Sequence, residues 1–146
     1  MMLKRILAPV DFSAQTQKSL DFINTMAPCG IDEIILMHVV DIRILNDTSM
    51  MFEESLDEKE FLKTCTKNAR IKLENLANNF SNKKIKVSTL VHNGVPFSVI
   101  INEAQKLDVS LIILGHKGHN LAGELLIGST AEKVVRKSNK PVLLTR

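Results

Sequence analysis

Three glycines and a hydroxyl residue near the C-terminus have a spacing that suits phosphate binding. They are Gly115, Gly118, Gly128 and Ser129, which together form the pattern G-x2-G-x9-G-S. Glycine permits a positive φ and lets the backbone approach a ligand where a Cβ atom would be in the way. The pattern therefore predicts a loop whose backbone closes around phosphate groups.

The segments on either side place this loop next to a helix N-terminus. Residues 109–115 are an apolar run typical of a buried strand, and residues 129–138 have the pattern of a helix. The first N–H groups of a helix have no intrahelical partner and carry partial positive charge, so they favour an anion. Ser129 and Glu132 also match a capping box, which would close this helix end without any ligand. The glycine pattern alone leaves both interpretations open.

The composition predicts one globular domain over residues 1–146, with 45% hydrophobic and 24% charged residues. The net charge is only +3, the basic residues are scattered and there is no Trp or Tyr, so nucleic acid is not an expected partner. No apolar run reaches the roughly 18 residues that a membrane span needs, so we expect no membrane association and a cytoplasmic location. Cys29 and Cys65 belong to no CxxC or His/Cys cluster and are expected to be reduced structural thiols.

Apolar runs of strand length alternate with segments of helical period. The predicted strands cover residues 6–10, 34–40, 85–91, 109–115 and 141–145. Two predicted helices are opened by the caps Ser13 and Ser55, a third has Pro96 at its first position, and the last begins at Ser129. This order specifies an α/β fold, an open doubly wound five-stranded parallel sheet with helices on both faces. Ligands of such a sheet bind outside the carboxyl ends of the strands, at a topological switch point.

Several local signals refine these elements. Strand 34–40 is apolar throughout, which indicates burial on both faces, whereas strand 85–91 alternates and is expected at a sheet edge. The first helix should carry Ala27 on its apolar face and end near Pro28 and Gly30. Residues 41–54 are longer than an ordinary connection, so they form either a lid beside the site or a disordered segment.

The ends of the first, second and fourth strands bring polar residues to one rim. Asp11 is suited to ribose hydroxyls or to a metal held by phosphates, although it could also be a turn residue before Ser13. His38 lies inside an apolar strand and is expected to be a hydrogen-bonded core histidine. His116, Lys117 and His119 lie in the glycine loop, where they could face either phosphate or solvent.

The chain resembles the universal stress protein family, specifically its ATP-binding branch, whose signature G-x2-G-x9-G-[ST] is matched at every position. The resemblance extends over essentially the whole chain and includes residues 6–13, 36–41 and 140–144. It implies a parallel sheet of order 3-2-1-4-5, a homodimer, and ATP bound at the rim. Together with Asp11, the glycine frame leads us to expect Mg or Mn with that ATP.

The resemblance also implies roles for particular residues. Pro9, Val10 and Asp11 would border the nucleoside, and the backbone of Val39 would meet the adenine. The phosphates would be held by Gly115, His116, Lys117, Gly118, His119, Asn120, Gly128, Ser129, Thr130 and Ala131. Many family members have a small residue followed by Arg or His between the first two glycines, and here the pair is His116-Lys117. This departure affects the side-chain contribution but not the backbone cradle.

Other nucleotide-binding patterns are missing. No G-x-G-x-x-G follows the first strand, as a dinucleotide dehydrogenase would require, and no G-x-x-x-x-G-K-[ST] string of a P-loop occurs. The acidic pair of a response regulator and the H-x-G-H element of adenylyl-transferring enzymes are also missing.

Two functions are consistent with the sequence. The first is a regulatory ATP-binding module in the stress response, acting on unknown protein clients, and the alternative is a slow ATPase. Hydrolysis needs a positioned base, and Glu124 is the only acid in the glycine loop, so we favour the binding module.

The predicted edge strand at residues 142–145 would pair with its copy in a homodimer.

Overall fold

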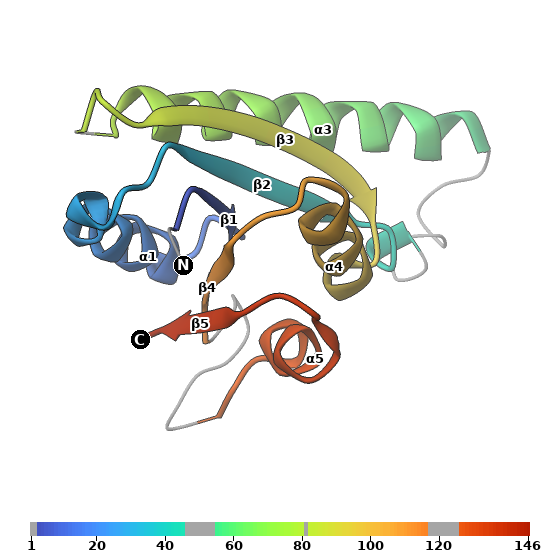
Figure 1. Ribbon diagram of the computed structural model, residues 1–146. Coiled ribbons are helices and arrows are strands. Elements are labelled where there is room, and N and C mark those ends of the chain that lie inside the picture. The colour runs from blue at the N-terminus through green and yellow to red at the C-terminus, as the bar shows by residue number, and fades with distance from the viewer. Residues whose placement is uncertain (1–2, 46–54, 81, 117–125) are drawn as a thin grey trace.

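Five parallel strands form a single sheet in this computed structural model, which describes residues 3–45, 55–80, 82–116 and 126–146 (Figure 1). The strands are β1 (Arg5–Pro9), β2 (Glu33–Asp41), β3 (Lys86–Gly94), β4 (Leu111–Gly115) and β5 (Val142–Thr145). They lie in the order β3-β2-β1-β4-β5, and the pairings are parallel. The predicted fold class and strand order are confirmed, and β3 is an edge strand as its alternating sequence indicated.

Helices cover both faces of this sheet (Figure 1). They are α1 (Ala14–Thr25), the 3-10 helix η1 (Ala27–Cys29), α3 (Ser55–Asn78), α4 (Pro96–Lys106) and α5 (Ser129–Lys137). Buried side chains of α1 and α3 belong to one hydrophobic cluster, and those of α4 and α5 belong to a second. Therefore α1 and α3 pack on one face of the sheet, and α4 and α5 pack on the other.

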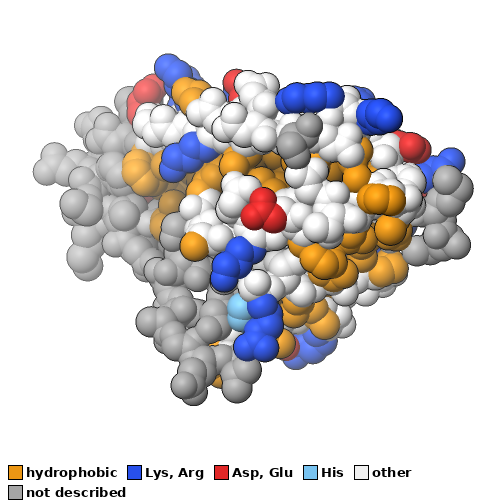
Figure 2. Space-filling model, turned by 90° about the vertical axis from the view of Figure 1, so that its left-hand side faces the viewer, with side chains coloured by type: hydrophobic (Ala, Val, Ile, Leu, Met, Phe, Trp, Pro, Cys, Tyr) orange, Lys and Arg blue, Asp and Glu red, His pale blue; other side chains and the backbone are white. Residues whose placement is uncertain are grey.

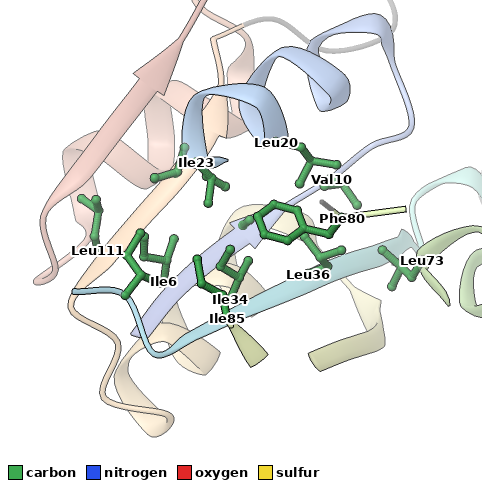
Figure 3. Packing of buried hydrophobic residues seen from close by; sticks show 13 residues of the cluster. Ile6, Val10, Leu20, Ile23, Ile34, Leu36, Leu73, Phe80, Ile85 and Leu111 are labelled. Carbon is green, nitrogen blue, oxygen red and sulfur yellow. The ribbon is translucent and has the colours of Figure 1, made fainter. Parts of the chain in front are cut away.

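Alternating side chains along the central strands produce these two clusters. In β1, Ile6 faces α1 and α3, whereas Leu7 faces α4 and α5; in β2, Leu36 and Met37 divide in the same way. Since both faces are covered, the central strands contain almost no polar residues. Figure 3 shows the first cluster, in which labelled side chains from the sheet, α1 and α3 point toward one another.

The strands β1 and β4 separate before β1 ends. All of β1, from Arg5 to Pro9, pairs with β2, but β4 pairs only with Ile6 and Leu7. Beyond Pro9 the chain stays attached to β2, because the Val10 N–H donates to the carbonyl oxygen of Met37 at 2.8 Å. Successive strands lie on opposite sides of β1, so this fork is the topological switch point of the sheet.

The first helix is shorter than predicted. Ser13 is its N-cap, as expected, and accepts a hydrogen bond from the Gln15 N–H through its side chain. The helix ends at Thr25, and Ala27 belongs to η1 instead of the helical face. Proline has no N–H group to continue an α-helical ladder, so Pro28 favours the separate 3-10 turn, which Gly30 closes with a left-handed φ of 86°.

The surface agrees with the composition. On the face shown in Figure 2, lysine and arginine side chains lie in several separate places among polar and hydrophobic ones. None of the described helices is both long and apolar enough to cross a membrane. Cys29 and Cys65 are free thiols.

Candidate functional site

A cleft of about 810 Å³ opens at the carboxyl ends of the central strands. Its walls come from the ends of β1, β2 and β4, from the first turns of α1, α4 and α5, and from Cys65 of α3. This is the position at which a doubly wound sheet binds ligands. The volume lies within the roughly 300–1,000 Å³ that small-molecule sites occupy.

The cleft brings together most of the described residues that the sequence assigned to a nucleotide site. The wall includes Pro9, Val10, Asp11, Val39, Gly115, Ser129, Thr130 and Ala131. His116 and Gly128 adjoin this wall in the chain without being part of it. Residues Lys117, Gly118, His119 and Asn120 lie outside the described residues, as do 46–54 of the predicted lid segment and Glu124. Contact of any of these residues with a nucleotide stays a prediction.

The turn between β1 and α1 places Asp11 on the cleft wall. Its Oδ1 accepts a hydrogen bond from the Ser13 N–H at 3.0 Å. Asp11 is therefore a turn residue and a cleft residue at once. The carbonyl oxygen of Val10 accepts a hydrogen bond from Nδ1 of His38 at 2.8 Å. His38 is thus hydrogen-bonded as expected, but it is half-buried and lines the cleft, so its expected place in the core was wrong.

The N-terminus of α5 reaches the cleft without a side-chain cap. Gly128 is the N-cap, with φ −60° and ψ 152°, and its carbonyl oxygen accepts from the Glu132 N–H at 2.9 Å. The predicted capping box is wrong, because Ser129 is the first helical residue and glycine has no side chain with which to cap. The N–H groups of Ser129, Thr130 and Ala131 precede the first intrahelical bond, so this end of the cleft suits an anion.

His116 connects three elements at the edge of the site. Its backbone N–H and its Nδ1 both donate to the carbonyl oxygen of Thr145, each at 2.9 Å. Its own carbonyl oxygen accepts from the Gly128 N–H at 2.6 Å. His116 therefore links the end of β4 to β5 and to the start of α5, and its ring faces the end of β5.

The described part of the cleft wall carries carboxylates but no lysine or arginine. Its acids are Asp11, Asp41 and Glu132. The hydrogen bond from the Arg43 guanidinium, 2.6 Å at its shortest, lowers the pKa of Asp41 below its ordinary value. Glu132 Oε1 lies 3.2 Å from Nε of Arg136. The two ion pairs offset part of this negative charge but leave no excess of positive charge to neutralise a polyanion.

Sequence reasoning missed the polar residues through which α1 contributes to the cleft. They are Gln15, Thr16 and Ser19. Thr16 and Ser19 are buried, like Leu20 and Ile23 on the same helix. Polar residues on the inward face of an amphipathic helix were the available signal.

The apolar part of the wall was also missed. Its members include Met37, Pro96, Ile100, Leu126 and Ile127. In a sequence, such residues cannot be distinguished from ordinary core residues of strand ends and first helical turns. The exposed fractions of Leu126 (67%) and Ile127 (50%) show that these two are not core residues.

The sheet is open and parallel, the cleft lies at its switch point, and an uncapped helix N-terminus reaches that cleft. This is the architecture of doubly wound α/β proteins that bind ligands at their strand ends. The model of the universal stress protein family matches residues 2–146. The chain therefore belongs to the universal stress protein family, as its motifs indicated.

Individual relatives agree with this assignment. Universal stress protein MJ0577 of Methanocaldococcus jannaschii is 31% identical over 100% of this chain and 96% of its own length. A solved structure of MJ0577 has a TM-score of 0.85 with 32% identity, and the match covers 99% of this chain and 96% of that one. Universal stress protein YxiE of Bacillus subtilis is 29% identical, covering 99% of this chain and all of YxiE (100%). The universal stress protein from Archaeoglobus fulgidus in complex with dAMP shares the fold, with a TM-score of 0.62, 20% identity and 100% coverage of both chains.

Proposed function

We propose that this chain is an ATP-binding universal stress protein that acts as a nucleotide-dependent regulatory module in the stress response. The observation that carries the proposal is the first turn of α5, which lies in the cleft and has glycine instead of a capping side chain. The glycine frame of Gly115, Gly118, Gly128 and Ser129 supports the same conclusion from the sequence. A nucleotide complex of a family member, with dAMP, supports the class of ligand.

The arrangement of the cleft suggests how ATP would be divided between its walls. The nucleoside would lie against Pro9, Asp11 and Val39, beside the apolar residues from β2 and α4. The phosphates would lie at residues 115–120 and at the start of α5, where the N–H groups of residues 129–131 are available. Since the motif recognises phosphates, ATP should bind more tightly than AMP.

A divalent cation, Mg²⁺ or Mn²⁺, should accompany the ATP. The described cleft wall has acids but no lysine or arginine, so it does not neutralise a triphosphate. Within the described residues, no three His, Cys, Asp or Glu side chains converge to hold a metal. The cation would therefore be held mainly by phosphate oxygens, with Asp11 as the nearest carboxylate in the proposed site.

The described acids of the cleft favour ATP binding over ATP hydrolysis, because each already has a hydrogen-bond or ion-pair partner. Asp11 accepts from the Ser13 N–H, while Asp41 and Glu132 are paired with Arg43 and Arg136. A general base for water must be positioned and available to take a proton. A phosphate-release assay with an Asp11→Ala control tests this choice, because release that depends on Asp11 would favour the slow ATPase.

Replacement of Gly128 by Asp tests the site itself. Aspartate is a good N-cap residue, so Gly128→Asp should leave the stability of α5 unchanged or raise it by about a few tenths of a kcal/mol. Its carboxylate would occupy and repel the proposed phosphate position, so ATP affinity measured by calorimetry should fall at least about tenfold.

Gly128→Asn is the matched control, because it has the same size without the charge and should lose less affinity. Unchanged ATP affinity in Gly128→Asp would contradict the assignment of phosphates to α5.

A further inference from the structure

Two polar atoms on the α1 wall of the cleft lack a hydrogen-bond partner. Within the described residues, Oε1 of Gln15 and Oγ1 of Thr16 are buried and make no hydrogen bond. Thr16 as a whole is only 7% exposed, and both residues line the cleft. A buried polar group without a partner costs stability, so its presence calls for an explanation.

The structure of α1 itself does not supply that explanation. The helix is already capped by Ser13, whose Oγ accepts from the Gln15 N–H and whose carbonyl oxygen accepts from the Thr16 N–H. One turn further on, Ser19 Oγ is satisfied by Thr145 Oγ1 at 2.5 Å. The side chains of Gln15 and Thr16 are therefore not needed for capping or for tying α1 to β5.

The chemistry of this wall selects the kind of group that it would bind. Gln15 Oε1 can only accept a hydrogen bond, and the Thr16 hydroxyl can donate or accept. The carboxylate of Asp11 lines the same cleft and also accepts. These oxygens suit the hydroxyl groups of a ligand, which can donate to all three, better than phosphate oxygens, which cannot donate and which the charge of Asp11 repels.

The position of the wall agrees with this selection. Asp11 lies in the connection after β1, and Gln15 and Thr16 lie in the first turn of α1, which begins beyond the fork where β4 no longer pairs with β1. The uncapped turn of α5, which suits phosphates, belongs to the helix layer on the other face of the sheet. The cleft thus has one end that suits an anion and a separate wall that suits hydroxyl groups.

We propose that Gln15 and Thr16, together with Asp11, form a subsite that recognises the vicinal hydroxyl groups of a ribose. The proposal rests on the proposed function and deepens it, because it makes the site selective for ribonucleotides over nucleotides that lack these hydroxyls. Gln15 and Thr16 are the residues that determine this specificity.

The test compares the affinities of ATP and 2′,3′-dideoxy-ATP, both with excess Mg²⁺, by calorimetry. The wild type should bind ATP more tightly. Thr16→Val and Gln15→Leu should each weaken ATP binding by about three- to tenfold, the value of one hydrogen bond, and leave dideoxy-ATP unchanged. Thr16→Ser keeps the hydroxyl and should retain the preference. Gln17→Leu is the matched control, because Gln17 is exposed and donates to Asp21 instead.

The stability of the ligand-free variants distinguishes this role from a structural one. Thr16→Val replaces an unpaired buried hydroxyl with a methyl group of the same shape, so its melting temperature should equal or exceed that of the wild type. A lower melting temperature together with equal losses for both nucleotides would overturn the subsite, as would an unchanged preference for ATP in both variants. Failure of the wild type to bind either nucleotide would overturn the proposed function itself.

Discussion

Phe12 shows how one residue supports the wall of the cleft. It follows Asp11 and has a φ of 62°, a left-handed conformation that residues with a Cβ atom rarely adopt. Its ring lies 4.6 Å from the ring of His38, and Nζ of Lys72 lies 5.1 Å from its centroid. These contacts, and its packing against the core beneath α1, offset the cost of the backbone conformation.

Substitutions at Phe12 separate the ring contacts from the backbone strain. Both Phe12→Ala and Phe12→Gly lose the contacts, so both should be less stable than the wild type. Alanine is ordinarily more stable than glycine, but at a φ of 62° glycine avoids the left-handed penalty. We therefore expect the free energy of unfolding of Phe12→Gly, measured with urea, to be about 1 kcal/mol higher than that of Phe12→Ala. The ordinary order, with alanine more stable, would contradict a strained turn.

Individual residues were predictable where their role depended on near neighbours in the chain. Ser13 was identified correctly as the cap, and the turn role of Asp11 was the alternative left open beside a role in ligand binding, because both hydrogen bonds span only two residues. Thr16 was not identified, because its place on the cleft wall depends on how α1 packs against strands that are distant in sequence. A polar residue on the inward face of α1 was the only local signal.

At the scale of elements, one helix N-terminus was predicted correctly from the sequence and another was not. Pro96 was correctly placed in the first turn of α4, since a proline has no N–H to leave unsatisfied. The Ser129-x-x-Glu132 pattern was misleading, because Gly128 takes the cap position and its carbonyl oxygen begins the helical ladder. The predicted N-cap was wrong by one residue, and that difference decides whether a side chain caps the helix end or the end is available to an anion.

The edge pair β2 and β3 contains a carboxylate whose ionisation is linked to stability. Ser88 of β3 donates to Glu33 of β2 at 2.7 Å, and Arg5 and Lys86 lie 2.9 and 3.5 Å from the same carboxylate. The hydrogen bond from Ser88, followed by the charges of Lys86 and Arg5, lowers the pKa of Glu33 below its ordinary value. The resulting stabilisation is present above the ordinary pKa and is lost as pH falls through the lowered one.

Ser88→Ala should reduce this pH-dependent stabilisation. At about pH 7 the variant should be less stable by about 1 kcal/mol, because Glu33 loses a hydrogen bond. The difference should shrink as pH falls below the ordinary carboxyl pKa and through the lowered pKa of Glu33, because the protonated carboxyl group no longer gains from the charge-assisted hydrogen bond. Urea unfolding across this range measures it. Ser98→Ala on α4 is the control, since Ser98 bonds no carboxylate among the described residues, and a constant difference at all pH values would reject the linkage.

At the scale of the whole molecule, the α/β layers of the fold followed from periodicity. Continuous apolar runs predicted strands buried on both faces, and helical segments between them predicted parallel connections, which gave the layers that the structure has. The strand order came from the family resemblance. The cleft could be placed at the strand ends, but its apolar wall and its α1 wall could not, because they arise from the packing of elements that are distant in sequence.

Among the described strands, β5 has a neighbour on one side only, so its outer edge is where the molecule could assemble. The carbonyl oxygen of Pro141 accepts from Ile112 of β4, and that of Thr145 accepts from His116, directly after β4. Because main-chain groups alternate along a strand, those of Leu143 also face β4, and those of Val142 and Leu144 point away from the sheet. A short apolar edge of this kind is open to pairing with another strand. We propose that two copies of the chain pair there antiparallel, about a two-fold axis.

Leu144→Pro tests this dimer with little damage to the sheet. Proline would remove an outward N–H of the edge while leaving the bonds between β5 and β4, which use Pro141 and Thr145. Leu144→Ala is the matched control, because it loses the same packing against α4 and α5 but keeps the N–H. Light scattering at micromolar concentration should give twice the 16.3 kDa of one chain for the wild type and for Leu144→Ala, and a single-chain mass for Leu144→Pro. A wild type of 16.3 kDa would reject the dimer, and a dimeric Leu144→Pro would show that the copies associate through another surface.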